Sequence, residues 1–322
     1  MFGPFTLRLV PALVVSALSI SAGPAVVSPP PTSSDPTSTI ETKTHLHEAS
    51  GTEVRTGKFR VFEDREARAG RVLELDVVVL PATGRREPDP VFVLLGGPGL
   101  AAATHWNGWV GHWMRDRRDI VLVSQRGTGG SNRLGCSTPA GDDNPQGYLD
   151  PYFDEAVFRE CLDGLSRRAD LSKYSTPIAM DDLNDVRIAL GYDRINLYGG
   201  SYGSRAQLVY IRRHPETVRT AILNSVAPIS FTNPLYHARG AQDVLEMIFD
   251  ECAADPACSA RFGDLRAKFN AVLERLDEQP ADAIVAHPVS GEPVPVRVSR
   301  DAFTESMRFM MYSGIRDVPL II

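Results

Sequence analysis

The sequence has little excess of either charge and no concentration of basic residues, and each lack excludes a class of protein. Its 322 residues carry a net charge of −6 at pH 7, and lysine and arginine form no basic cluster. Binding to nucleic acid is therefore not expected, because it requires a concentrated positive surface. The charged residues are well mixed, so no acidic tail is present either. With 43% hydrophobic residues, the chain can bury a large core.

Cysteine is scarce as well, with four residues: Cys136, Cys161, Cys252 and Cys258. Their spacings differ from the C-x₂₋₄-C pairs of zinc sites, and no histidine is placed nearby, so we expect neither a metal nor another cofactor. The number suits an exported protein, in which disulfides form. Cys252 and Cys258 flank a proline-bearing loop that could close a small disulfide ring, which leaves the other two cysteines as the remaining pair.

The N-terminus has the composition of a targeting segment. An apolar run over residues 9–27 follows Arg8 and ends in small residues, which predicts a secretory signal peptide over residues 1–27. The alternative is an uncleaved membrane anchor, but Pro11 and Pro24 interrupt a run that is short for a membrane span. We therefore expect cleavage, a secreted or periplasmic protein with no stable membrane anchor, and a disordered linker over residues 28–50.

Ser201 lies in the pattern G-x-S-x-G, over residues 199–203. A short apolar stretch at 195–197 precedes the pattern and a stretch typical of a helix, 204–213, follows it. A serine at such a turn between strand and helix is the nucleophile elbow of α/β-hydrolases, in which strained backbone exposes the hydroxyl group. Gly199 and Gly203 must be small because strand and helix pass close together there. Ser201 is thus the predicted nucleophile.

A second glycine-rich turn predicts the oxyanion hole. The apolar run 91–95 leads into Gly-Gly-Pro-Gly at 96–99, as expected of a buried strand that enters a tight loop. In α/β-hydrolases the loop after the third strand supplies one backbone N–H, and the residue after the nucleophile supplies the other. We assign Gly97 and Tyr202 to these roles, with Gly96 or Gly99 as alternatives to Gly97. Losing one such donor typically costs about 3–4 kcal/mol of transition-state stabilisation.

A third apolar run, 120–123, leads into Ser124-Gln125-Arg126-Gly-Thr-Gly-Gly-Ser131. With the two motifs above, this segment resembles the proline iminopeptidase and tripeptidyl aminopeptidase family of α/β-hydrolases, from about residue 60 to the end of the chain. That family has G-G-P-G, D-Q-R-G-x-G-x-S and G-G-S-Y-G in this order. The chain departs from it at Ser124, where the family has aspartate, so we expect an ion pair near this motif to be missing. Arg126 is expected to brace loops rather than to catalyse.

The resemblance implies a serine aminopeptidase that cleaves peptide N-termini through an acyl-enzyme on Ser201. It also implies both disulfides, Cys136–Cys161 and Cys252–Cys258. An esterase on the same fold is an alternative, because fold does not fix the substrate.

Strand and helix patterns alternate through the first part of the chain, which predicts a doubly wound, mostly parallel sheet. The tryptophans Trp106, Trp109 and Trp113 recur at helical spacing and are expected to form the apolar stripe of a helix, or Trp106 to line a substrate pocket. Asp182, early in a predicted helix at 177–190, is expected only to complement the helix dipole. We expect further strands at 59–63, 72–80 and 218–224 and a helix at 153–167.

The pattern changes after residue 228. Predicted helices at 238–252, 264–279 and 301–312 and a hairpin around 284–298 replace the alternation. We therefore expect an incomplete cap at 229–322 over a hydrolase core at 51–228. Glu246 and Glu305 are candidates to bind the free amino group of a peptide, with plain surface charge as the alternative.

The sequence supplies no obvious general base. The histidines after the nucleophile are His214, His237 and His287, and none follows a strand with an acid upstream. The order in this fold is Ser, Asp, His, so we expect the catalytic Asp and His to lie beyond Ile322. A non-catalytic remnant without its base is therefore another alternative.

Overall fold

The computed structural model describes residues 40–136, 140–141, 143–151 and 154–322. The predicted signal peptide lies outside these residues. The linker prediction is wrong at its end, because residues 41–47 form a strand that pairs antiparallel with the next one, from Glu41 opposite Lys58 to His47 opposite Thr52. All but the last of its side chains are exposed, so no hydrophobic pattern marks it in the sequence. Within the described residues, none of the helices combines the length and the apolar character that a bilayer crossing needs.

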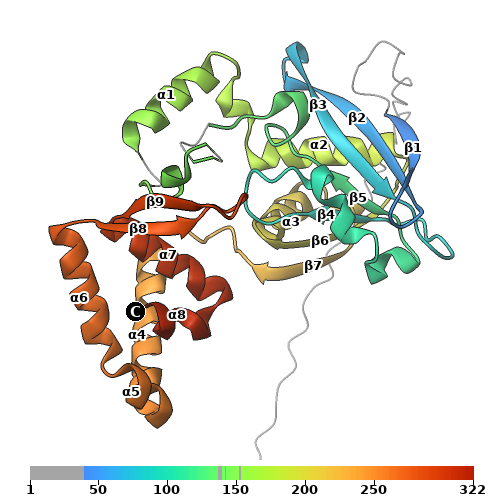
Figure 1. Cartoon of the computed structure of the whole chain (residues 1–322). Coiled ribbons are helices and arrows are strands. Elements are labelled where there is room, and N and C mark those ends of the chain that lie inside the picture. The colour runs from blue at the N-terminus through green and yellow to red at the C-terminus, as the bar shows by residue number, and fades with distance from the viewer. Residues whose placement is uncertain (1–39, 137–139, 142, 152–153) are drawn as a thin grey trace, which may run out of the picture.

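Seven strands form the central sheet, in the order β1-β2-β3-β5-β4-β6-β7 (Figure 1). The neighbouring pairs β1–β2, β2–β3 and β3–β5 are antiparallel. The pairs β5–β4, β4–β6 and β6–β7 are parallel. Strand β4 is flanked by β5 and β6, the two strands that follow it in sequence, so the connections diverge at its carboxyl end. Ligands bind at such a point in open α/β sheets. The strands are β1 (Glu41–His47), β2 (Thr52–Asp64), β3 (Ala69–Leu80), β4 (Val91–Leu94), β5 (Ile120–Val123), β6 (Ile195–Ser201) and β7 (Val218–Val226).

Both faces of the sheet are covered, which confirms the doubly wound class. Helices α2 (Thr176–Ala189) and α3 (Tyr202–Arg213) pack on one face, where Met180 and Tyr210 join Phe92 in the larger core cluster. The strands β4 and β5 are buried at every position, as the apolar runs predict for parallel strands covered on both sides.

The other face is covered by two short 3₁₀ segments, η1 (Ala102–Trp109) and η2 (Trp113–Asp116), rather than by one helix. Trp106 and Trp109 pack against the second core cluster, whereas Trp113 is 67% exposed. The predicted stripe of three tryptophans is therefore wrong at its last member, because the chain turns between the two segments.

Helix α1 (Glu155–Ser166) lies apart from the sheet and is joined to the preceding loop by the disulfide Cys136–Cys161. The Asp154 carboxylate caps its first turn, since it accepts from the N–H groups of Ala156 and Val157. Short 3₁₀ turns lie in the connecting segments. Three of them lie between β5 and α2: η3 (Gly130–Asn132), η4 (Pro145–Tyr148) and η5 (Leu171–Lys173). The turn η6 (Pro215–Thr217) connects α3 to β7.

The segment after β7 forms a helical unit with its own hydrophobic cluster, in which Phe249, Phe269 and Met307 pack together (Figure 1). The disulfide Cys252–Cys258 links its first two helices. Both predicted disulfides are therefore present. The elements are α4 (His237–Ala254), α5 (Pro256–Phe262), α6 (Leu265–Glu278), β8 (Ala281–Ala286), β9 (Pro293–Val298), α7 (Arg300–Ser313), η7 (Ile315–Asp317) and α8 (Val318–Ile321).

A described contact between this unit and the loops around the sheet joins Gln146 to Arg297. The Gln146 side chain, in η4, accepts from the backbone N–H of Arg297 at 2.8 Å and donates to its carbonyl at 3.2 Å. The Gln146 side chain thus hydrogen-bonds to the backbone of β9 as a residue of a neighbouring strand would. The division at residue 228 into core and cap stays a prediction.

Candidate active site

Ser201 ends β6 and directly precedes α3, with φ 52° and ψ −122°. A serine pays a steric cost in this region of backbone space, and such strain concentrates at functional positions. The two flanking glycines are required by close packing, since a Cβ on Gly199 or Gly203 would collide with the Leu94 carbonyl at the end of β4. The predicted elbow geometry is present.

Two buried side chains of α3 hold this strained backbone. The Ser204 hydroxyl donates to the Ser201 carbonyl at 2.6 Å and accepts from the Ala227 N–H at 2.9 Å. One turn further along, the Gln207 amide donates to the carbonyls of Gly199 at 3.1 Å and of Ile222 at 3.2 Å. Sequence reasoning missed both, although polar residues that fall on the core face of a helix are a usable signal for such bonds.

The structure brings the two predicted oxyanion residues together. Gly97 and Tyr202, together with Gly99, line one small cavity of about 10 Å³ at the 95–100 loop, close to the space that a single water needs. Gly97 has φ 61° and Gly99 has φ 103°, so the loop uses conformations that glycine adopts most easily. Gly96 packs against the elbow instead, since a Cβ there would lie 3.2 Å from that of Ser201.

Tyr202 is fixed from two further segments. Its hydroxyl donates to the Gln125 side-chain oxygen at 3.0 Å and shares a hydrogen bond of 3.1 Å with the Thr176 hydroxyl. Gln125 follows β5 and Thr176 begins α2, so two separate segments fix the Tyr202 side chain.

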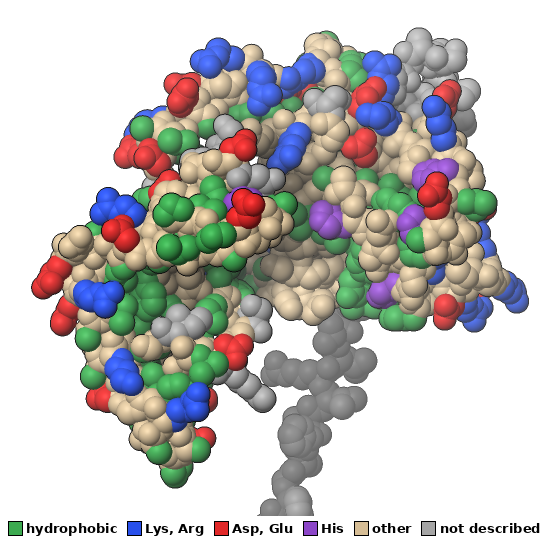
Figure 2. Space-filling view, in the orientation of Figure 1, with side chains coloured by type: hydrophobic (Ala, Val, Ile, Leu, Met, Phe, Trp, Pro, Cys, Tyr) green, Lys and Arg blue, Asp and Glu red, His purple; other side chains and the backbone are tan. Residues whose placement is uncertain are grey.

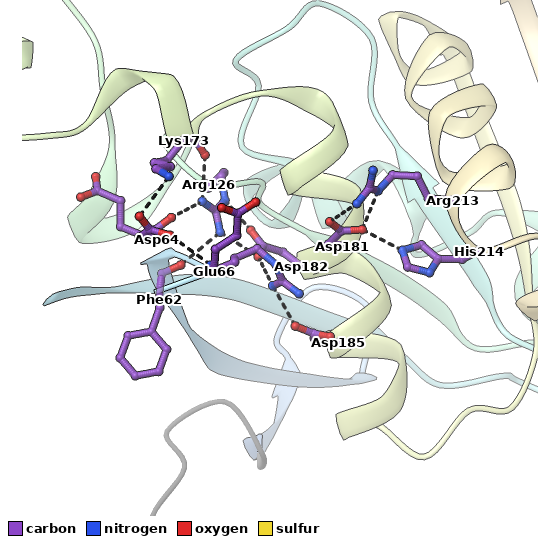
Figure 3. A network of polar contacts seen from close by, with 12 residues as sticks. Phe62, Asp64, Glu66, Arg126, Lys173, Asp181, Asp182, Asp185, Arg213 and His214 are labelled. Atoms are coloured by element: carbon purple, nitrogen blue, oxygen red, sulfur yellow. Dashed lines mark hydrogen bonds and ion pairs between the residues drawn. The ribbon is translucent and has the colours of Figure 1, made fainter. Parts of the chain in front are cut away.

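Arg126 is buried and forms an ion pair that the sequence did not predict (Figure 3). Its guanidinium donates to both carboxylate oxygens of Asp182, at 2.6 and 2.8 Å. Arg65 donates to the same carboxylate at 2.7 Å. One prediction is thereby wrong, because Asp182 is not a mere partner of the helix dipole. Ser124 itself carries no charge, and its hydroxyl accepts from the Ala103 N–H at 3.1 Å.

The remaining bonds of Arg126 confirm its bracing role. It donates to the carbonyls of Glu63 and Lys173 at 2.9 and 2.8 Å and to that of Phe62 at 3.3 Å. Burial raises the pKa of Asp182, while the guanidinium groups around it act in the opposite direction. This network joins the end of β2 to α2 and to the loop after β5.

The histidines after Ser201 bond to other groups. His214 pairs with Asp181 at 3.0 Å, and Arg213 pairs with the same carboxylate (Figure 3). Burial alone would raise the pKa of Asp181, but the hydrogen bonds from Arg213 and His214 outweigh it and lower that pKa. The other two rings bond to nearby backbone groups, His237 to the Pro234 carbonyl and His287 to the N–H groups of Val289 and Ser290.

No hydrogen bond to the Ser201 hydroxyl is found in the described part of the chain, and no cluster of metal-ligating side chains is found among those residues. The two acidic candidates for binding an amino group are engaged with arginines. Glu246 pairs with Arg266, and Glu305 pairs with Arg308 at 2.6 Å. Charged side chains of both signs are interspersed over the visible face (Figure 2). The ion pairs of Glu246 and Glu305 favour the alternative of plain surface charge.

Trp109, rather than Trp106, lines a pocket beside the loop at 95–100. Trp106 instead packs edge-on against the His47 ring, with centroids 4.9 Å apart. Trp106 is thus absent from the residues that line this pocket, contrary to the alternative that it lines a substrate pocket.

A family model described as alpha/beta hydrolase fold matches residues 89–285. The serine protease Hip1 of Mycobacterium tuberculosis is 29% identical over 279 residues, which cover 80% of this chain and 50% of that protein. The probable proline iminopeptidase of Streptomyces coelicolor is 31% identical over 39% of this chain and 42% of its own length. The tripeptidyl aminopeptidase of Streptomyces lividans is 29% identical over 46% of this chain and 30% of its own length. The chain spans about half the length of the first of these relatives and a smaller share of the other two.

Proposed function

Because this chain belongs to the α/β-hydrolase family, we propose that it is an exported serine aminopeptidase that cleaves peptide N-termini through an acyl-enzyme on Ser201. The relatives named as serine protease, proline iminopeptidase and tripeptidyl aminopeptidase support peptidase chemistry. Two disulfides support export, because such bonds persist in oxidising compartments.

The observation that carries the proposal is the backbone of Ser201, strained at φ 52° between β6 and α3 and next to the loop at 96–99. In this arrangement the Ser201 oxygen attacks the scissile carbonyl carbon. The carbonyl oxygen becomes an oxyanion that accepts from the N–H groups of Gly97 and Tyr202. The C–N bond then breaks, the amine leaves with a proton, and water hydrolyses the acyl-enzyme.

A base must accept the Ser201 proton and return it to the amine. No described histidine bonds to Ser201, so this role is not assigned to a residue of the described part. The bonds of Ser204 and Gln207 to the elbow would keep the nucleophile in place whichever group supplies the base.

A fluorophosphonate probe followed by peptide mass mapping tests the nucleophile. We expect labelling of Ser201 in the wild-type chain and none in Ser201→Ala. A wild-type chain that does not label under conditions that label the related peptidases would favour the inactive remnant.

Paired 4-nitroanilide substrates test the aminopeptidase activity, one with a free amino group and one acetylated. We expect the free substrate to be cleaved faster. Equal rates would rule out an aminopeptidase, and hydrolysis of esters alone would favour the esterase alternative.

A further inference from the structure

An open pocket of about 590 Å³ lies on the outer side of the loop at 95–100. Its walls are mainly apolar and include Leu95, Leu100 and Trp109, with Gly96 at one edge and His105 and Asn107 among the polar lining. The volume falls within the range of about 300–1,000 Å³ that is typical of small-molecule sites.

The pocket begins beside the nucleophile. A Cβ on Gly96 would lie 3.2 Å from the Ser201 Cβ and 3.1 Å from the Gly200 carbonyl. Leu95 and Leu100 border both this pocket and the small cavity that contains Gly97 and Tyr202. A substrate whose carbonyl oxygen lies at the loop therefore places the neighbouring side chain at the mouth of the pocket.

The aromatic wall is held in place by the strand that carries the nucleophile. The Trp109 ring meets the Tyr198 ring edge-on, with centroids 5.4 Å apart and an angle of 74°, and lies 4.8 Å from the His112 ring. Tyr198 precedes Ser201 by three residues in β6. A wall fixed in this way loses little side-chain entropy when a ligand packs on it.

The chemistry of the walls selects an uncharged group. No acidic or basic side chain other than His105 lines the pocket, and the His105 ring is tied to the Ala101 carbonyl at 3.0 Å. We propose that this pocket is a specificity site that takes an apolar side chain, aromatic or large aliphatic, from a residue next to the scissile bond. The inference rests on the proposed function, because only the substrate of a peptidase has a scissile bond. Binding of an apolar side chain in the pocket does not depend on catalysis.

Binding of amino acid amides tests the inference without turnover. The probe is 4-fluorophenylalaninamide, titrated by fluorine NMR and displaced by leucinamide or glycinamide. Burying a large apolar side chain should make the first two bind at least about tenfold more tightly than glycinamide. Trp109→Ala should abolish this preference, while Trp113→Ala, at an exposed position outside the pocket, should keep it.

A second variant covers the case in which Trp109→Ala does not fold, as circular dichroism would reveal. Leu100→Asn changes a wall residue that is already 49% exposed, so it should fold and still weaken the preference about tenfold. Equal binding of glycinamide and the fluorinated probe, or an unchanged preference in the folded wall variants, would overturn the inference.

Fluorophosphonate labelling of the same samples separates the two proposals. Selective binding without any labelling of Ser201 would leave the pocket in place and argue against the proposed function. Labelling of Ser201 without selective binding would support the proposed function and overturn the inference about the pocket.

Discussion

The buried pair of Arg126 and Asp182 gives the sharpest prediction for stability. Both side chains are almost inaccessible, with 1% and 2% of the side-chain surface exposed. Arg126→Met leaves the Asp182 carboxylate buried with Arg65 as its remaining cation. Breaking a buried pair in this way typically costs about 3–5 kcal/mol. At roughly 2–4 °C for each kcal/mol in a protein of this size, we expect Tm to fall by about 10 °C.

An exposed pair in the same chain provides the matched control. Arg159 pairs with Glu155 one turn earlier on α1, with 73% and 78% of their side-chain surfaces exposed. Solvent screens such a pair, so Arg159→Met should cost less than about 1 kcal/mol. Thermal and urea unfolding of both variants, followed by circular dichroism, measures the difference.

A double variant separates the buried charge from the other bonds of Arg126. R126M/D182L removes both charges but still leaves three carbonyls without their donor, those of residues 62, 63 and 173. We expect it to be more stable than R126M alone by about 2 kcal/mol, without reaching the wild type. The reasoning would be refuted if the double variant lost as much stability as R126M and D182L together. It would also be refuted if R126M lost no more stability than the Arg159 control.

Three further predictions concern the elbow, acid stability and a disulfide. Gly203→Ala places a methyl group against the carbonyl at the end of β4 and should prevent soluble expression, whereas Gly200→Ala, whose Cβ would have its nearest neighbour at 3.5 Å, should express normally. Asp181 has a lowered pKa, so it stabilises the fold above its unfolded pKa and loses this effect as the pH falls through its folded value. Asp181→Asn should therefore flatten the fall in urea midpoint below about pH 4, and an unchanged slope would contradict this. Replacing Cys252 and Cys258 with alanine opens a ring with a sequence separation of 6 and should cost about 2 kcal/mol in unfolding experiments; no loss under oxidising conditions would show that the bond adds nothing.

The sequence predicted those parts of the site that depend on short, contiguous patterns. A strand, a turn of fixed glycine spacing and a helix define the elbow within seven residues, so Ser201 and Tyr202 could be placed from the chain alone. The loop with Gly97 follows the same logic, because a buried parallel strand must end in a tight turn.

The parts that were missed depend on distant partners. Arg126 and Asp182 are 56 positions apart, and no local pattern links a loop arginine to an acid on the core side of a later helix. The bond of Ser204 to Ala227 similarly needs the position of β7.

The short strand β1 has a consequence for how the protein must be produced. It covers the outer edge of β2, a strand of 13 residues, with a polar and charged surface. Long uncovered edges invite intermolecular pairing, and lysine on an outer strand discourages it; β1 carries Lys43. Trimming the N-terminus at residue 51, where a hydrophobic pattern would start the domain, would expose the backbone of β2 and promote aggregation. A soluble recombinant protein should therefore begin no later than residue 40, even though the segment that it must keep looks dispensable.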